Sequence, residues 1–412
     1  MPKMSHGELI QLMIQLGVML AFGRLMAEVA RKFKQPAVVG EILAGILLGP
    51  TVLGTFSVDA FQSLFPATGT SMVVLDGFTK VAVVMLLFIA GLEVDLRIVF
   101  QQGKQALYSS SLGLLIPFAF GFGIPFAFPT FFAGTDILIS AFFMGTAMAI
   151  SALPVIVRIL MDLKLFKTKI GMLVVASAMV DDLIGWIVFS IILGMIGKGR
   201  EIAAGYTFLL TIGFAGFMLT IGRGLLNRIL PWINKKLAWP GGLLSLSLAL
   251  CFLAAAFTEF IGIHAVFGAF IIGIALGDSE HMSERAKEIV HQFINNIFAP
   301  LFFVAIGLKV NFLINFDPLL TTAVIFIAFA GKILGCGLGS RMGDLGWRES
   351  FATGFGMNAR GAMEIILGIV AFENGIINEK VFVSLVIMAL VTSMTSGPLM
   401  KWMLGPALKD EL

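Results

Sequence analysis

Stretches of about 20 mostly apolar residues recur along almost the whole chain, and no other feature restricts its fold as strongly. A transmembrane helix needs about 20 such residues. Of the 412 residues, 58% are hydrophobic and 13% are charged, whereas about a quarter of the residues of a soluble domain are charged. One water-soluble core cannot bury so much apolar surface. The pattern therefore predicts an all-α polytopic membrane protein rather than a soluble enzyme.

We predict about thirteen transmembrane helices from these stretches. Their approximate bounds are residues 9–30, 36–55, 73–93, 105–128, 135–160, 170–197, 205–223, 241–260, 262–277, 293–309, 318–338, 351–373 and 381–404. The first stretch has no small-residue cleavage site after it, so we interpret it as a retained helix rather than a signal peptide. Because the net charge is only +3 and no basic run is present, we expect no nucleic-acid partner.

The lysines and arginines between these helices predict the orientation of the chain. Loops that follow odd-numbered helices, together with the C-terminal tail, carry eighteen of them, whereas the opposite side carries only Lys3, Lys198, Arg200 and Lys380. Basic residues accumulate on the cytoplasmic side of membrane proteins. The count predicts an N-terminus outside the cell and a C-terminus in the cytoplasm.

Two sequence motifs recur and predict an internal repeat. The glycines of "VVGEILAGILLGP" (38–50) return 228 positions later in "VFGAFIIGIALGD" (266–278), and "GLEVDL" (91–96) returns as "GLKVNF" (307–312). Each pair is separated by seven predicted helices, so the copies have opposite orientations in the membrane. We expect one transmembrane domain over 1–412, with repeats at about 9–197 and 241–404 and a linker helix at about 205–223. Chance matching of glycine-rich apolar sequence is the alternative.

Two adjacent carboxylates, Asp181 and Asp182, lie near the middle of the sixth predicted helix. An ionisable residue at such a depth costs roughly 2.5–3.5 kcal/mol on insertion scales, so a functional reason is expected. Two carboxylates in a dry site repel each other, which favours protonation of one of them. When ionised, their oxygens are hard ligands suited to Na⁺. The pair therefore predicts a site for protons and a monovalent cation, and a purely structural pair is the alternative.

Other ionisable residues lie in the predicted helices, and each needs a partner or a water-filled cavity. Lys332 is the natural countercharge for an aspartate, although the residues alone leave open which of the two. Arg360 and Glu364 are four residues apart and share one helical face. Glu41 and Glu259 are further candidates as partners of Arg360 or Lys332.

Two predicted helices contain signals for an interruption. Pro154 lies in the middle of the fifth, and Gly354, Gly356 and Gly361 surround Asn358 and Arg360 in the twelfth. Irregular backbone at membrane depth occurs only where it is buried in protein or lines a cavity. The backbone groups at the ends of the interrupted helices and the hydroxyls of the fifth helix can then contribute to cation binding. The candidate hydroxyl ligands are Thr146 and Ser151.

Several of these motifs resemble those of the bacterial monovalent cation:proton antiporter 2 family. They are "KQPAVVGEILAGILLGPTVLG" (34–54), "LLFIAGLEVDL" (86–96), "SALPVIVRIL" (151–160), "ASAMVDDLIGWIV" (176–188), "PLFFVAIGLKV" (300–310) and "GMNARGAMEIILG" (356–368). The resemblance implies thirteen helices, a dimerisation domain beside a six-helix core with two crossed, discontinuous helices, and elevator-type alternating access. It also implies a homodimer in the bacterial cytoplasmic (inner) membrane.

The resemblance further implies roles for the site residues. Asp182 is then the main carrier of Na⁺ and protons, and Asp181 is the partner of Lys332. Relatives with two aspartates and this lysine are generally electrogenic sodium/proton exchangers. No cofactor is expected, only transported Na⁺ or K⁺ and H⁺, and no C-terminal regulatory domain. A K⁺/H⁺ antiporter of the same family and an organic-anion symporter are the alternatives, and a channel or sensor would lack proton coupling.

Overall fold

The computed structural model describes residues 4–33, 35–66, 68–94, 96–163, 165–166, 168–196, 204–236 and 239–405. Within these residues the chain forms helices and no strand, which confirms the predicted all-α class. Lys3, Lys198, Arg200 and the C-terminal tail lie outside the described residues, so the orientation stays a prediction.

The helices correspond to the predicted membrane segments. Eleven helices are long and apolar enough to cross a membrane, and a bent pair, 347–357 with 362–373, raises the number to twelve. The ninth predicted segment is a shorter apolar helix, Ala265–Gly277. The described part of the chain is thus that of a multi-pass membrane protein, and thirteen remains an approximate count.

The chain forms two compact units, each assembled from segments of both predicted repeats. Unit 1 contains residues 1–92, 221–256 and 268–316, and unit 2 contains residues 93–220, 257–267 and 317–412. The helices that lie wholly or mostly in unit 1 are α1 (His6–Lys32), α2 (Ala37–Leu48), α3 (Leu53–Phe56), α4 (Val58–Leu64), α5 (Thr70–Leu92), α11 (Arg223–Lys236), α12 (Gly241–Phe260), α13 (Ala265–Gly277) and α14 (Glu284–Lys309).

Unit 2 contains both interrupted helices. Its helices are α6 (Leu96–Ala127), the 3₁₀ helix η1 (Pro129–Phe132), α7 (Ile137–Ala149), α8 (Leu153–Asp162), α9 (Lys169–Ile196), α10 (Ala204–Phe217), α15 (Pro318–Met342), α16 (Trp347–Met357), α17 (Ala362–Glu373) and α18 (Glu379–Leu404). A π-helical turn, η2 (Met218–Gly222), joins α10 to α11.

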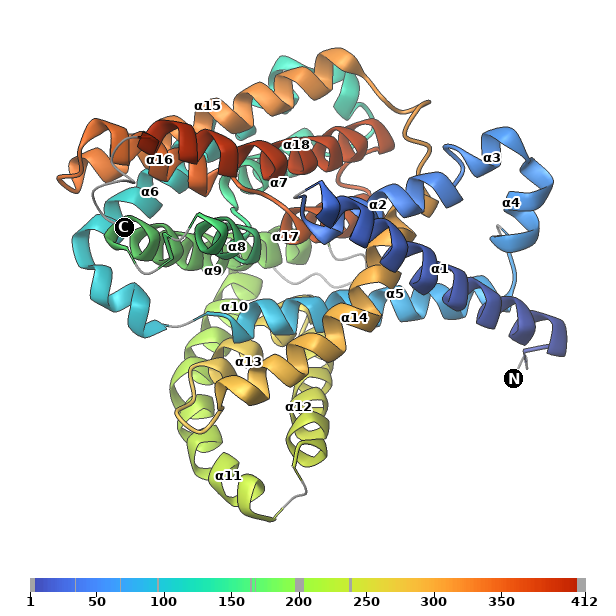
Figure 1. Ribbon diagram of the computed structural model, residues 1–412, viewed down its shortest axis with the longest axis horizontal. Coiled ribbons are helices and arrows are strands. Elements are labelled where there is room, and N and C mark those ends of the chain that lie inside the picture. Colours follow the sequence, from blue (N-terminus) through green and yellow to red (C-terminus); the bar gives the residue numbers. More distant parts are fainter. Residues whose placement is uncertain are drawn as a thin grey trace. The chain divides into compact units, whose positions relative to one another are not determined.

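Glycines of the repeated motifs allow two equivalent helix pairs in unit 1 to pack closely. A Cβ on Gly45 of α2 would lie 2.1 Å from the carbonyl oxygen of Val304 in α14, and a Cβ on Gly273 of α13 would lie 2.3 Å from that of Phe88 in α5. In the repeat α2 corresponds to α13, and α5 corresponds to α14. The same contact is therefore built twice, and Figure 1 shows α2 beside α14.

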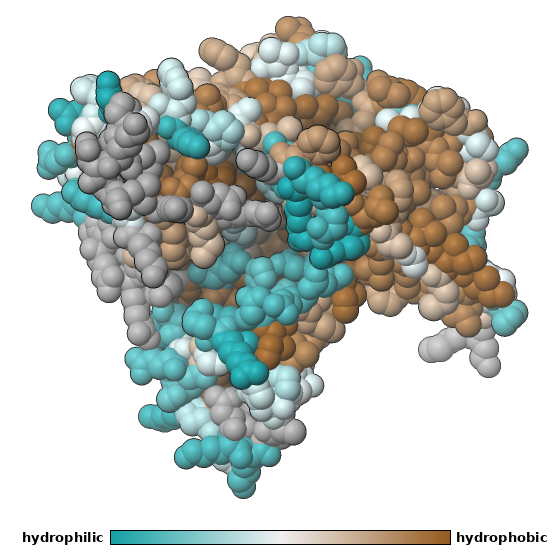
Figure 2. All heavy atoms as spheres, in the orientation of Figure 1, coloured by the Kyte–Doolittle hydropathy of each residue, from teal (hydrophilic) through white to brown (hydrophobic). Residues whose placement is uncertain are grey.

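The exposed face of α1 in unit 1 has the apolar character of a lipid-facing surface. Leu9, Ile10, Met13 and Ile14 of α1 are 45–54% exposed, and Figure 2 shows apolar side chains over α1 and hydrophilic ones over α11. Exposed apolar side chains of this kind are favourable in hydrocarbon and unfavourable in water.

Replacing the packed glycines is expected to destabilise the protein. In Gly45→Ala and Gly273→Ala the added methyl group meets a backbone carbonyl that no rotamer change can move, at a cost of roughly 1–3 kcal/mol. The measurement is thermal unfolding of the detergent-solubilised protein.

Gly17→Ala on α1 is the matched control, because no atom lies within 4 Å of a Cβ at this position. It should leave the stability unchanged or raise it slightly through helix propensity. Equal stability of all three variants would contradict the close packing.

Candidate functional site

The two interrupted helices of unit 2 cross at their breaks and are hydrogen-bonded to each other there. The first break lies at residues 150–152, between α7 and α8, and the second separates α16 from α17, which are bent by 46°. The N–H of Ala152 donates to the carbonyl of Ala359 (2.9 Å), and the Ser151 hydroxyl donates to the carbonyl of Met357 (2.8 Å). Each break therefore satisfies backbone groups of the other.

Local sequence explains where α8 begins. Pro154 stands in its first turn, where a backbone N–H has no partner within the helix and proline is tolerated. A proline in the middle of a continuous helix would leave a carbonyl unpaired. The chain therefore stops α7 at Ala149 and starts a new helix at Leu153.

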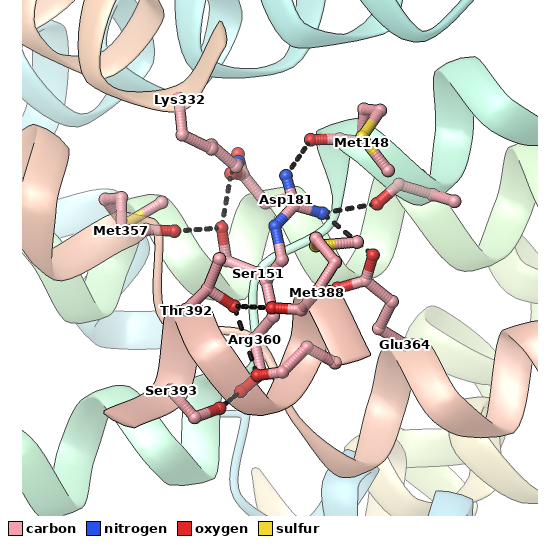
Figure 3. Close-up of polar contacts among 12 residues, drawn as sticks. Met148, Ser151, Asp181, Lys332, Met357, Arg360, Glu364, Met388, Thr392 and Ser393 are labelled. Carbon is pink, nitrogen blue, oxygen red and sulfur yellow. Dashed lines mark hydrogen bonds and ion pairs between the residues drawn. The ribbon is translucent and has the colours of Figure 1, made fainter. Parts of the chain in front are cut away.

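Arg360 closes the carboxyl end of α7. Its Nη1 donates to the carbonyl of Ala147 (2.5 Å) and its Nη2 to that of Met148 (2.5 Å), while Nη1 also pairs with Glu364 Oε1 at 3.0 Å (Figure 3). The last carbonyls of a helix have no partner within it, and a guanidinium presents several donors in a fixed plane. Both charged side chains are buried, so the pair compensates its own charge and caps α7.

Asp181 is held by three side chains, two from helices and one from the first break. Ser110 of α6 donates to Oδ1 (2.8 Å), and Lys332 of α15 contacts Oδ2 at 2.5 Å. Ser151 lies 3.4 Å from the same Oδ2 (Figure 3). Because a hydroxyl has a single proton and Ser151 also lies 2.8 Å from the carbonyl of Met357, Ser151 can donate to only one of these acceptors at a time. Asp181 and Lys332 are completely buried.

Close packing of α15 against α6 brings Lys332 to this position. A Cβ on Gly331 would lie 2.8 Å from Pro117, and one on Gly335 would lie 2.5 Å from the carbonyl oxygen of Leu112. Between these two glycines the Lys332 ammonium also donates to the carbonyl of Gly113 (3.0 Å). The lysine is therefore fixed by two acceptors.

Asp182 has a different environment from its neighbour. Adjacent residues diverge by about 100° around a helix, and the carboxylate of Asp182 lies near the backbone N–H of Leu153, the first residue of α8. Negative charge is favourable at a helix N-terminus. Among the described residues no group hydrogen-bonds to its buried Oδ1. Glu93 lies near enough to repel it electrostatically.

The two aspartates therefore differ in their free ligand capacity. The oxygens of Asp181 are occupied by an ammonium and by hydroxyls, whereas Asp182 keeps a buried carboxylate oxygen without a partner among the described residues. A buried carboxylate without a counter-ion is unstable unless it binds a proton or a cation. Asp182 is the carboxylate that can bind either.

The remaining predicted residues lie elsewhere or make other contacts. The Thr146 hydroxyl donates to the carbonyl of Phe142 in its own helix (2.8 Å). Glu259 accepts the N–H of Ala265 (2.9 Å) at the start of α13. Glu41 belongs to unit 1, where Arg31 and Arg24 of α1 act on it electrostatically. The structure does not pair Glu41 or Glu259 with Lys332 or Arg360.

Sequence reasoning missed Ser110 and the backbone carbonyls of the site. Ser110 belongs to a run of three serines, 109–111, inside a predicted span, and such a run of hydroxyls is a usable signal. The carbonyls of Ala147, Met148 and Gly113 carry no residue-type signal, because every residue has the same carbonyl group.

Replacing Arg360 by lysine is expected to lower the stability of the protein. Arg360→Lys keeps the charge but cannot reach two carbonyls and Glu364 together, and Arg360→Gln leaves Glu364 as a buried unpaired carboxylate, a loss of about 3–5 kcal/mol. Thermal unfolding should therefore rank the wild type above Arg360→Lys and Arg360→Lys above Arg360→Gln.

Glu364→Gln combined with Arg360→Gln removes the unpaired charge and should recover part of the loss. If Arg360→Lys were as stable as the wild type, the carbonyl contacts of Arg360 would not matter for the fold.

Comparison with known proteins identifies the family. Residues 17–405 match the family described as sodium/hydrogen exchanger, transmembrane. The chain is 32% identical over 403 residues to the Na⁺/H⁺ antiporter NhaS4 of Synechocystis, which covers 96% of this chain and 98% of that protein. It is 34% identical over 399 residues to cation/H⁺ antiporter 17 of Arabidopsis thaliana, covering 94% of this chain and 48% of the plant protein. The chain thus spans about half the length of that plant relative.

The fold is also that of a solved structure. The sodium proton antiporter MjNhaP1 from Methanocaldococcus jannaschii superposes with a TM-score of 0.68 at 17% identity, over 98% of this chain and 99% of the other. At this identity the likeness shows the fold alone. The family match covers nearly the whole chain and agrees with the motifs quoted above, so the chain belongs to the sodium/hydrogen exchanger family.

Proposed function

We propose that the chain is a secondary antiporter, not an enzyme, and that it exchanges Na⁺ for H⁺ across a membrane by alternating access. The observation that carries the proposal is the inequality of two adjacent buried carboxylates. Asp181 is neutralised by Lys332, while Asp182 has an oxygen without a partner among the described residues. The names of the relatives, Na⁺/H⁺ and cation/H⁺ antiporters, support it.

Competition at Asp182 couples the two ions. A proton on its carboxyl group removes the charge, and a bound Na⁺ balances the charge, so either ion makes the buried site neutral. Both ions need the same oxygen, so one leaves as the other binds. The site is stable only when an ion occupies it, so it moves across the membrane with either Na⁺ or a proton bound. Na⁺ and protons are therefore carried in opposite directions.

Lys332 gives the cycle its expected voltage dependence. A cation beside Asp182 repels the ammonium 2.5 Å from Asp181, and this repulsion favours release of a proton from the lysine. Two protons then move against one Na⁺, and net charge crosses the membrane. Exchange should therefore respond to an imposed membrane potential.

The charges at the crossing favour a cation over an organic anion. Both buried cations of this cluster already pair with a carboxylate, Lys332 with Asp181 and Arg360 with Glu364. Asp182 remains as an additional negative group. A site for an anionic substrate would need the opposite balance, so the symporter alternative is disfavoured.

The proposal also covers the location, the oligomeric state and the orientation of the protein. We place the protein in the bacterial cytoplasmic (inner) membrane as a homodimer, with the N-terminus outside and the C-terminus in the cytoplasm, because the loop charges predict this orientation. The transported ions are its only small-molecule partners, and no cofactor takes part.

Asp182→Asn should abolish Na⁺-driven proton movement. The amide keeps the shape of the side chain but neither gains nor loses a proton in the working pH range. The measurement is dequenching of a pH-sensitive dye in proteoliposomes after addition of Na⁺. Asp59→Asn, at an exposed position on α4, is the control and should behave like the wild type. Intact exchange by Asp182→Asn would refute the proposal.

The same assay separates sodium from potassium as substrate. Titrations of Na⁺, Li⁺ and K⁺ on the wild type should give half-saturation at the lowest concentration with Na⁺. A preference for K⁺ would assign the protein to the K⁺/H⁺ alternative and leave the role of Asp182 in place.

Removing Lys332 should affect both stability and voltage dependence. Lys332→Gln leaves Asp181 buried and unpaired, a loss of about 3–5 kcal/mol, and Lys332→Gln with Asp181→Asn should recover most of it. The double variant should still exchange Na⁺ for H⁺ but no longer respond to a valinomycin-imposed potential. An unchanged response would show that Lys332 carries no transported charge.

A further inference from the structure

Asn358 is a buried polar side chain without a partner in the described part of the chain. It is fully buried at the bend between α16 and α17, and neither its Oδ1 nor its Nδ2 makes a hydrogen bond with any described residue. Its backbone N–H, in contrast, donates to the carbonyl of Gly354 (3.1 Å). Leaving a buried amide unpaired is unfavourable, and such a group calls for an explanation.

The position of Asn358 relates it to Asp182 through the crossing. The carbonyls of its two chain neighbours, Met357 and Ala359, accept from Ser151 and Ala152 of the other break. The backbone N–H of Leu153, the residue that follows this break and begins α8, lies near the carboxylate of Asp182. Figure 3 shows Ser151 between the carbonyl of Met357 and the carboxylate of Asp181. Asn358 and Asp182 therefore adjoin the same three-residue segment, 151–153.

Both residues bring an oxygen without a partner to this crossing. Asp182 has its buried Oδ1, and Asn358 has its amide Oδ1. An alkali cation that loses its water shell needs protein oxygens in place of the water oxygens. The carboxylate of Asp182 and the amide oxygen of Asn358 would supply two of these ligands.

We propose that the side-chain amide of Asn358 is a ligand of the transported cation and a determinant of its affinity and selectivity. This inference rests on the proposed function. The amide oxygen differs from a carboxylate in that it binds no proton in the working pH range. Asn358 therefore strengthens cation binding without strengthening proton binding, and shifts their competition at Asp182 toward the cation.

The test measures the cation concentration at half-maximal exchange in proteoliposomes. Asn358→Ala should raise this concentration for Na⁺ by about tenfold, the effect of losing a ligand worth 1.4 kcal/mol, while the rate at saturating Na⁺ stays within about twofold of the wild type. The ratio of the Na⁺, Li⁺ and K⁺ values should also change.

Ser190→Ala is the matched control. Ser190 is another buried polar side chain without a hydrogen-bond partner among the described residues, and it lies on α9 two turns beyond Asp182. Its removal should leave all three half-saturation values unchanged. Asn358→Asp keeps an oxygen and should retain tight Na⁺ binding, with a steeper pH dependence because the new carboxyl group also binds protons.

A second readout does not depend on transport. Na⁺ should raise the thermal unfolding temperature of the purified wild type and of Ser190→Ala, but raise that of Asn358→Ala much less at the same concentration. If Asn358→Ala does not fold, Asn358→Asp and Asn358→Gln supply the comparison.

The outcomes separate this inference from the proposed function. Unchanged half-saturation values and an unchanged Na⁺-induced thermal shift in Asn358→Ala would overturn the role of Asn358 while exchange through Asp182 stands. If the wild type exchanged no cation for protons, the proposed function would fail, and the thermal shift would still decide whether Asn358 binds a cation.

Discussion

Two helices that end in the middle of a membrane leave backbone groups that water cannot reach, and the rest of unit 2 depends on how these groups find partners. Each such group costs several kcal/mol if it stays unpaired in hydrocarbon. The chain meets this constraint by crossing the two breaks, so that Ala152 and Ser151 donate to carbonyls of the second break. Arg360 supplies donors for the end of α7, and Glu364 compensates its charge.

The same constraint creates the chemistry of the site. The N-terminus of α8 favours negative charge, and the carboxylate of Asp182 lies near the N–H of Leu153 there. Asp181 points to a different set of partners, because adjacent residues diverge around α9, and Lys332 neutralises it. One carboxylate is thus paired with a countercharge, and the other keeps a buried oxygen without a partner among the described residues, which we propose binds the transported ion. In this proposal the two aspartates of the apolar helix α9 have different roles.

Much of this architecture could be predicted from the sequence. The apolar segments predicted the helices, and Pro154 indicated the break that the structure has at residues 150–152. The repeated glycines belong to two equivalent close contacts, α2 with α14 and α13 with α5. Residue types were informative here because a charged residue, a proline or a glycine strongly affects the stability and packing of a helix in a membrane.

Pairings between distant residues could not be predicted in the same way. Lys332 contacts Asp181 across 151 positions of sequence, and the residues alone left either aspartate open as its partner. Glu41 and Glu259 were candidates on charge alone, yet Glu259 accepts the N–H of Ala265 and Glu41 belongs to the other unit. The acceptors of Arg360 are backbone carbonyls, which no residue type reveals.

The central claim is that a proton and a cation compete for the same carboxylate, and proton release during cation binding tests it most directly. Calorimetric titration of the purified protein with Na⁺, repeated in buffers of different ionisation enthalpy, counts the protons released for each Na⁺ bound. The account predicts at least one proton released per Na⁺ at a pH where Asp182 is protonated. Na⁺ binding with no proton release at any pH would contradict it.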